Sequence, residues 1–167
     1  MKIIKSVFSV FTIVVVLAFA ASAQTSLPQL NGGTVDIQAQ KGKIVILAVG
    51  ASWLPLSGKQ AEYTNMLAKK YAGKNVAVYF VLTDSTTKPK NMTSLEKINA
   101  FVTANKLTVP VLRDSDGTAT VKKFNIDQLP SFVILGPDGQ QVGKSFGGID
   151  PKFDITVPIS TVVDGLL

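Results

Sequence analysis

The 167-residue chain contains no cysteine and no histidine. The absence of cysteine excludes dithiol exchange, thiolate peroxidase chemistry and cysteine nucleophiles among the chain's own side chains, and it excludes zinc-finger sites. The absence of histidine removes the side chain that most often serves as a general base. No group of carboxylates has the spacing of a metal site. We therefore expect no catalytic residue, no cofactor and no metal ion.

Charged residues are also scarce, at 17% of the chain, and Arg113 is the single arginine among 17 basic residues. Against 11 acidic residues they give a formal net charge of +6. The longest basic runs are the pairs Lys69-Lys70 and Lys122-Lys123, which are typical of solvated helix faces. The sequence therefore predicts no nucleic-acid partner. The hydrophobic content of 46% indicates an ordered globular chain.

The N-terminus has the pattern of a secretory signal peptide over residues 1–23. Lys2 and Lys5 precede an apolar run at 7–20, and Ala-Ser-Ala at 21–23 is a small-x-small cleavage pattern. The run is short for a membrane span, which needs about 20 residues. We therefore expect cleavage, export to the periplasm or the extracellular space, and no integral membrane segment afterwards. An uncleaved membrane anchor is the alternative.

The mature chain is predicted to consist of a polar N-terminal arm at 24–33 and one domain at 34–167. Continuous apolar runs of strand length at 44–49 and 76–82 predict strands that are buried on both faces. The remaining expected elements are strands at 34–38 and 109–112, helices at 57–71, 95–102, 118–124 and 159–167, and a hairpin of 131–135 with 141–146. This order predicts an α/β three-layer sandwich, with a mixed central sheet flanked by helices.

Two of the predicted helices begin with the spacing of a capping box, in which a hydroxyl residue is followed three positions later by Glu or Gln. Ser57 and Gln60 have this spacing at one helix start, and Thr93 and Glu96 have it at the next. Ser57 could also be considered as a nucleophile, but such a serine needs an adjacent base, and no motif supplies one. We therefore predict a capping role for Ser57.

Several segments, taken in order, resemble the thioredoxin-like superfamily, and most closely its periplasmic TlpA-like and redoxin (AhpC/TSA-type) branch. The segments that carry the resemblance are Gly42–Leu47, Gly50–Trp53, Phe101–Asp114, Leu129–Ile134 and Pro137–Gly139. The resemblance runs from about Leu30 to the C-terminus and implies a thioredoxin-like fold.

The chain departs from this family at the redox motif. Where the family has Trp-Cys-x-x-Cys, the sequence reads Trp53-Leu54-Pro55-Leu56-Ser57, so Leu54 and Ser57 occupy the two cysteine positions. Loss of the first cysteine removes the attacking thiolate. Ala48 stands where relatives often carry an acidic or amide residue, and it cannot move protons. The resemblance therefore implies a redox-inactive member of an oxidoreductase family.

The resemblance also implies a binding face. Pro130 matches the family's cis proline, which faces the redox motif, and Leu129 before it can pair its backbone with an extended polypeptide. An ordinary trans proline is the alternative. If the family backbone is kept, an apolar partner-binding patch is formed by Trp53, Leu54, Pro55, Leu56, Leu129 and Pro130. The alternative is that Leu54 and Leu56 turn inward and fill the space left by the thiols.

Three functions are consistent with these observations. The leading one is a non-enzymatic module that binds a polypeptide or protein partner through the former active-site face. The second is a thiol-disulfide oxidoreductase or antioxidant protein that acts only together with a partner's cysteines. The third is a vestigial structural domain without a ligand.

Overall fold

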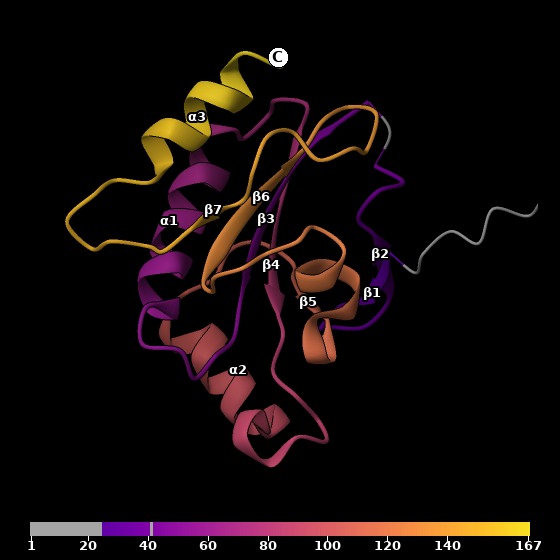
Figure 1. The fold of residues 1–167 in the computed structure, drawn as a ribbon, viewed down its shortest axis with the longest axis vertical. Helices are drawn as coiled ribbons and strands as arrows, with labels where there is room; N and C mark the ends of the chain where they lie inside the picture. The colour runs from indigo at the N-terminus through magenta and orange to yellow at the C-terminus, as the bar shows by residue number, and fades with distance from the viewer. Residues whose placement is uncertain (1–24, 41) are drawn as a thin grey trace, which may run out of the picture.

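The computed structural model describes residues 25–40 and 42–167, so the predicted signal peptide lies outside the described residues. At its centre is a five-stranded mixed sheet with the order β5-β4-β3-β6-β7 (Figure 1). Its strands are β3 (Ile44–Gly50), β4 (Val76–Leu82), β5 (Val111–Arg113), β6 (Ser131–Leu135) and β7 (Phe146–Gly147). Strands β3, β4 and β5 are parallel, and β6 is antiparallel to both β3 and β7. The predicted α/β class and mixed sheet are confirmed.

The two faces of the sheet are covered differently. All seven residues of β3 are buried, and alternate side chains point to opposite faces. On one face lie the three helices α1 (Ser57–Lys70), α2 (Leu95–Ala104) and α3 (Thr156–Asp164). The opposite face is covered by the N-terminal hairpin and by short helical turns, whose bounds are β1 (Ser26–Pro28), β2 (Thr34–Asp36), η2 (Ser115–Gly117) and η3 (Thr118–Lys122). Figure 1 shows α1 and α3 to the left of the sheet, α2 below it and the hairpin to its right.

Two hydrophobic cores result from this arrangement. Ala48 of β3 lies opposite Phe80 of β4 and Phe132 of β6, and all three belong to the core beneath the helices. Val49 points the other way, into the core beneath the hairpin. Ala48 is fully buried, so the centre of the sheet carries no side chain that could transfer a proton at this position.

The N-terminal part of the chain differs from the prediction. The segment at 24–33 is not only a polar arm, because β1 lies within it and pairs antiparallel with β2. The strand expected at 34–38 therefore belongs to a separate two-stranded sheet. Leu27 and Ile37 are buried against the central sheet. Their burial explains why this polar-looking segment is ordered.

The predicted hairpin near the C-terminus is confirmed, although its second strand is short. The Gly139 N–H donates to the Gly136 carbonyl at 2.9 Å and closes the turn. Leu135 and Gln141 form an isolated bridge beyond it, and β7 then pairs with the start of β6. A last short turn, η1 (Pro89–Asn91), lies in the loop after β4.

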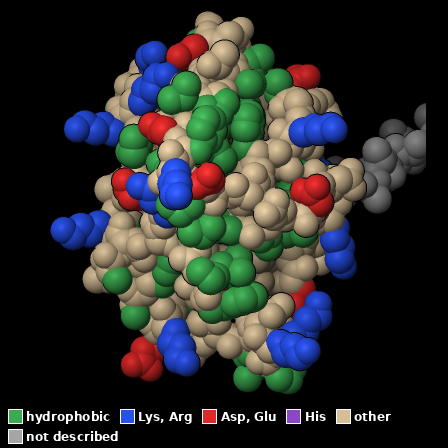
Figure 2. Space-filling model, turned by 60° about the vertical axis from the view of Figure 1, so that its left-hand side comes forward, with side chains coloured by type: hydrophobic (Ala, Val, Ile, Leu, Met, Phe, Trp, Pro, Cys, Tyr) green, Lys and Arg blue, Asp and Glu red, His purple; other side chains and the backbone are tan. Residues whose placement is uncertain are grey.

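On the helical side of the molecule, exposed apolar side chains gather in several groups (Figure 2). Figure 2 shows this side, with apolar side chains lying between lysines and carboxylates. Within residues 25–40 and 42–167, no helix has the length and apolar composition needed to cross a membrane.

Candidate functional site

Three segments meet at one end of the central sheet, where the parallel strands β3 and β4 finish. We call the surface that they form the turn face. The turn at 51–56 follows β3, the loop at 83–92 follows the parallel strand β4, and Pro130 directly precedes β6. Because Ser131 pairs with Val49, Pro130 lies next to the turn. Ligands of open α/β sheets bind outside the carboxyl ends of parallel strands, so the turn face is the candidate site.

The turn brings together the two positions that hold cysteines in the family. The Ser57 N–H donates to the Leu54 carbonyl at 3.1 Å, and the Leu54 N–H donates to the Ala51 carbonyl at 3.2 Å. Ser57 is buried, and its hydroxyl donates to the Ala51 carbonyl at 2.6 Å. No base contacts this hydroxyl among the described residues, which leaves Ser57 without the partner that a nucleophile needs.

Both predicted capping boxes are wrong. Leu56 precedes the first residue of α1, and no side chain caps this helix. At α2 the cap is Ser94, whose hydroxyl accepts from the Lys97 N–H at 3.3 Å, so the helix begins one residue later than the Thr93 spacing predicts. The spacing describes only local sequence, whereas Ser57 faces the protein interior and bonds to the nearest buried carbonyl.

Gln60 links α1 to the sheet directly beneath the turn. Its side chain is fully buried, and its Nε2 donates to the carbonyls of Val49 at 3.1 Å and Ser131 at 2.8 Å. The Oε1 atom has no hydrogen-bond partner and lies against Gly50, where a Cβ atom would collide with it. Gln60 therefore fixes the positions of the turn and of Pro130 relative to each other.

Asp84 ties the turn to the loop after β4. Its carboxylate is fully buried, and it accepts from the Ser52 N–H at 2.9 Å and from the Ser52 hydroxyl at 2.5 Å. Arg113 approaches the Asp84 carbonyl, with an Nη2–O distance of 3.4 Å. The polar residues and Pro89 in 83–92 predict only a loop, and this pattern does not single out Asp84. Its position directly after a buried parallel strand was the available signal.

The loop after β4 is further held by Ser85 and Asp116. The Ser85 hydroxyl accepts from the N–H groups of Thr87 at 3.1 Å and Lys88 at 2.8 Å. Lys88 forms an ion pair with Asp116 at 3.4 Å. Hydrogen bonding with the Ser85 side chain, together with Lys88, lowers the pKa of Asp116 below its ordinary value. These contacts give the loop after β4 a defined shape.

The predicted patch residues differ in their exposure. Trp53 is 49% exposed, and Pro55 is also exposed, whereas Leu54, Leu56 and Leu129 are half-buried. Leu56 packs against the core beneath the helices and Leu129 against the opposite core. The exposed patch is thus present at Trp53 and Pro55, whereas the leucines are turned partly inward, as the alternative describes.

The peptide bond between Leu129 and Pro130 is cis, in agreement with the resemblance. Pro130 itself is buried. No hydrogen bond joins the N–H or the carbonyl of Leu129 to another described residue. These two peptide groups therefore have no hydrogen-bond partner among the described residues.

Trp53 and Leu129 border two separate hollows of the turn face. Trp53 lines a groove of about 300 Å3 together with Ser52, Lys90, Met92, Thr93 and Lys97. Leu129 lines a smaller hollow of about 140 Å3 that also includes Lys88 and Asp116. The loop after β4 contributes residues to both hollows. The structure thus divides the single predicted patch into two neighbouring parts.

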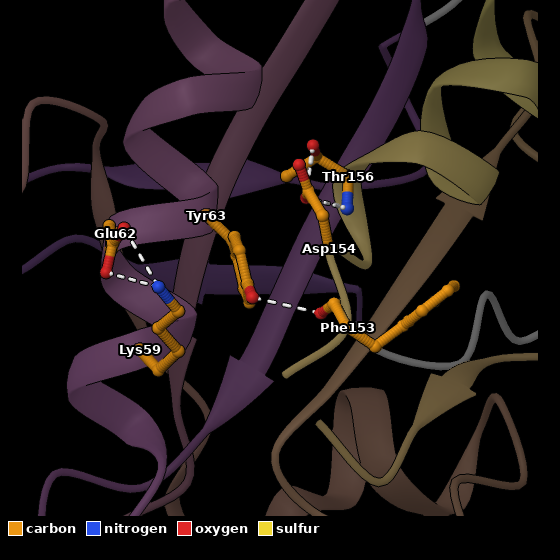
Figure 3. A network of polar contacts seen from close by, with 6 residues as sticks. All are labelled: Lys59, Glu62, Tyr63, Phe153, Asp154 and Thr156. Carbon is orange, nitrogen blue, oxygen red and sulfur yellow. Dashed lines mark hydrogen bonds and ion pairs between the residues drawn. The ribbon is translucent and has the colours of Figure 1, made fainter. Parts of the chain in front are cut away.

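A polar network fixes the segment before α3 against α1 (Figure 3). The Tyr63 hydroxyl donates to the Phe153 carbonyl at 3.0 Å, and the Asp154 carboxylate accepts from the Thr156 N–H at 2.9 Å. Lys59 pairs with Glu62 at 2.9 Å, and this hydrogen bond raises the pKa of Lys59 above its ordinary value. Lys59 is therefore a charged surface residue and does not act as a base toward Ser57.

The described residues contain no group of three or more carboxylates that could hold a metal ion. The polar side chains beneath the turn are engaged in holding the turn itself, through Ser52, Ser57, Gln60 and Asp84. The arrangement supplies an apolar, partly basic surface with unpaired peptide groups beside it.

Comparisons with known proteins agree with this fold. Residues 17–164 match the model of the AhpC/TSA family. The chain is 28% identical over 118 residues to the thiol-disulfide oxidoreductase ResA of Bacillus cereus, covering 71% of this chain and 63% of that protein. It is 32% identical over 118 residues to the thioredoxin-like protein YneN of Bacillus subtilis, covering 68% and 62%. The matches thus span less than two thirds of these relatives.

Solved structures of similar fold include MTB DsbF, with a TM-score of 0.67, 20% identity and coverage of 87% of this chain and 96% of that one. The exposed lipoprotein thioredoxin Etrx1 of Streptococcus pneumoniae has a TM-score of 0.64 and 22% identity, with coverage of 81% and 97%. At these identities the likeness establishes the thioredoxin-like fold.

Proposed function

The chain belongs to the AhpC/TSA family but contains no cysteine, and from this premise we propose that it is an exported, redox-inactive domain that binds an extended polypeptide or protein partner. The binding surface is the turn face. One observation carries the proposal: Trp53 and the cis peptide before Pro130 are both present, while Leu54 and Ser57 stand in the cysteine positions. Surface features suited to holding a polypeptide remain, whereas the thiols that would react with it are absent.

Two features of the turn face support polypeptide binding. Trp53 exposes half of a large amphipathic side chain, and Trp is enriched among the residues that dominate binding energy at interfaces. The unpaired N–H and carbonyl of Leu129 offer main-chain hydrogen bonds to an extended segment, which is how strands add to an existing backbone. Asp84 and Gln60 hold both features in place before a ligand arrives, and such preorganisation lowers the entropic cost of binding.

Export is supported by the sequence pattern at 1–23, with its basic start, apolar run and small-residue cleavage pattern. It also agrees with the description of one structural relative as an exposed lipoprotein. An exported thioredoxin-like domain without cysteine is insensitive to the redox state of its compartment. We propose the periplasm or the extracellular space as its location.

We expect the purified mature protein to show no reductase and no peroxidase activity, because it has no thiolate to attack a disulfide or a peroxide. Reduction of insulin in the presence of dithiothreitol and consumption of hydrogen peroxide are the two measurements. Both rates should equal the rate in buffer alone. Turnover above buffer in either assay contradicts the redox-inactive proposal.

Trp53→Ala should weaken polypeptide binding about thirtyfold, because truncation of a central interface Trp costs on the order of 2 kcal/mol or more. The measurement is binding to an array of short peptides of mixed sequence, followed by titration of the best binder. Trp53 is the single Trp, so its emission should also shift when that peptide binds.

Met66→Ala is the matched control for Trp53→Ala, because Met66 is an apolar residue of similar exposure, at 43%, on α1. Neither substitution should lower the melting temperature by more than a few degrees, since exposed side chains contribute little to stability. If Trp53→Ala unfolds the protein without affecting binding by the folded fraction, Trp53 is a packing residue. The vestigial structural domain then becomes the better description.

A further inference from the structure

We propose that the groove beside Trp53 binds an acidic segment of an extended polypeptide, with one large apolar side chain as its anchor. This inference rests on the proposed function, and it adds the chemistry of the partner. Six residues line the groove. Trp53 and Met92 are apolar, Lys90 and Lys97 are cationic, and Ser52 and Thr93 are polar and uncharged.

The charges around the groove have one sign. Lys90 and Lys97 are exposed, and no ion pair joins either of them to another described residue. Lys88, in the same loop, is instead paired with Asp116. No acidic side chain lines the groove. An acidic ligand would therefore find two unpaired ammonium groups and no opposing carboxylate.

Two acidic residues that are close in sequence to the lining residues, Asp84 and Glu96, do not line the groove. The Asp84 carboxylate is buried and bound to Ser52, so it does not present its charge to a ligand. Glu96 precedes Lys97 on α2 but is not among the residues that line the groove. The local charge around the groove is thus positive, in agreement with the positive net charge of the whole chain.

The two apolar side chains of the groove are exposed, and hydrogen bonds hold the residues next to them in place. Trp53 is 49% exposed and Met92 is 60% exposed. Ser52 is fixed by Asp84, and the Thr93 N–H donates to the Ser85 carbonyl at 3.3 Å. Apolar anchors in a preformed pocket dominate the energy of an interface, while charges at its rim set selectivity and association rate. The groove has both parts.

The size of the groove favours a short polypeptide segment over a large folded partner as the ligand. Its volume of about 300 Å3 is at the lower limit for small-ligand pockets, so it accommodates one anchor side chain. Single-stranded nucleic acid also combines anionic groups with stacking on aromatic rings, but it needs a basic track along its backbone. Two lysines beside two apolar side chains give no such track, and they fit a short polypeptide segment better.

The test uses three capped nine-residue peptides with a central Phe, flanked by Glu, by Gln or by Lys, and it follows Trp53 emission. We expect the Glu peptide to bind about tenfold more tightly than the Gln peptide at low ionic strength, and the Lys peptide to bind weakest. Because charges near the surface are screened by salt, the affinity for the Glu peptide should fall several-fold between about 0.05 M and 0.3 M ionic strength.

Charge reversal locates the site. Lys90→Glu combined with Lys97→Glu should weaken binding of the Glu peptide about tenfold or more and should improve binding of the Lys peptide. Lys43→Glu is the control, because Lys43 is also exposed but precedes β3 at the opposite end of the sheet. It should change either affinity less than twofold. All three substitutions are at exposed positions, so the variants are expected to fold.

The outcomes separate this inference from the proposed function. If all three peptides bind equally and shift Trp53 emission, the turn face binds polypeptide but has no acidic preference, and the inference is wrong. If the double variant keeps its affinity for the Glu peptide, the site is elsewhere. If single-stranded oligodeoxythymidine binds more tightly than the Glu peptide, the ligand class is wrong. If no peptide of any charge binds, the proposed function itself fails.

Discussion

Leu54→Cys combined with Ser57→Cys should yield a protein that forms an intramolecular disulfide and gains insulin reductase activity. The Ser57 N–H already donates to the Leu54 carbonyl at 3.1 Å. A four-residue turn closed in this way brings its end Cα atoms within about 7 Å, and a disulfide needs about 4.4–6.8 Å. The change is from no activity to measurable turnover, which makes it the largest effect that we expect.

The environment of the two positions should also make the new thiols reactive. A cysteine at position 54 would lie just before the N-terminus of α1, where the helix macrodipole favours the thiolate. It would be half-exposed, as Leu54 is, whereas a cysteine at position 57 would be buried, as Ser57 is. The first is therefore placed to attack a substrate disulfide and the second to resolve the mixed disulfide.

Oxidation is measured by the loss of two hydrogen atoms in the intact mass and by protection from alkylation. The two single variants, Leu54→Cys and Ser57→Cys, are the controls, and neither should form an intramolecular bond. A double variant with the circular dichroism of the native fold that stays reduced in oxidised glutathione would contradict the turn geometry. Insulin reductase activity in a single variant would instead indicate that its one cysteine reacts together with the dithiothreitol of the assay.

Gln60→Ala should destabilise the fold by about 3 kcal/mol, because it removes two buried hydrogen bonds and leaves a cavity in the core. Gln60 is fully buried and joins α1 to the carbonyls of Val49 and Ser131. For a domain of this size the melting temperature should fall by roughly 10 °C. Thermal unfolding followed by circular dichroism measures the effect.

Glu62→Ala is the matched control on the same helix, since Glu62 is exposed and pairs only with the surface residue Lys59. Its effect should stay within about 0.5 kcal/mol. Gly50→Ala offers an independent check, because its Cβ would collide with the Gln60 side chain and should displace the amide. If Gln60→Ala melts like Glu62→Ala, the amide is not a structural link between α1 and the sheet.

The elements that the sequence predicted well are those with strong local patterns. The continuous apolar runs of β3 and β4 and the periodicity of α1 follow from burial, which the order of apolar and polar residues along the chain reveals directly. The position of the turn and the cis peptide before Pro130 came from the resemblance of separate segments to one family. These features could be predicted without knowing which side chains contact each other in the fold.

The contacts that organise the turn face were not predictable in the same way. Ser52 and Asp84 are 32 positions apart, and Gln60 and Ser131 are 71 apart, so no local spacing relates them. The capping-box pattern at Ser57 and Gln60 is compatible with two structures, and the interior position of both side chains decided between them. The division of the patch into two hollows likewise depends on where the loop after β4 lies.

The two edges of the central sheet have a further consequence for how other chains can approach. Along β5, the Leu30 N–H donates to the Val111 carbonyl at 2.8 Å, and Gln29 bridges to Leu112, so the segment after β1 covers that edge. The other edge, β7, is only two residues long. Exposed edge strands are the usual template for aggregation and for unwanted sheet extension. The central sheet is thus protected from self-association through its edges. Under the proposed function, the unpaired peptide groups at Leu129 then act as a short docking point that does not compete with sheet extension.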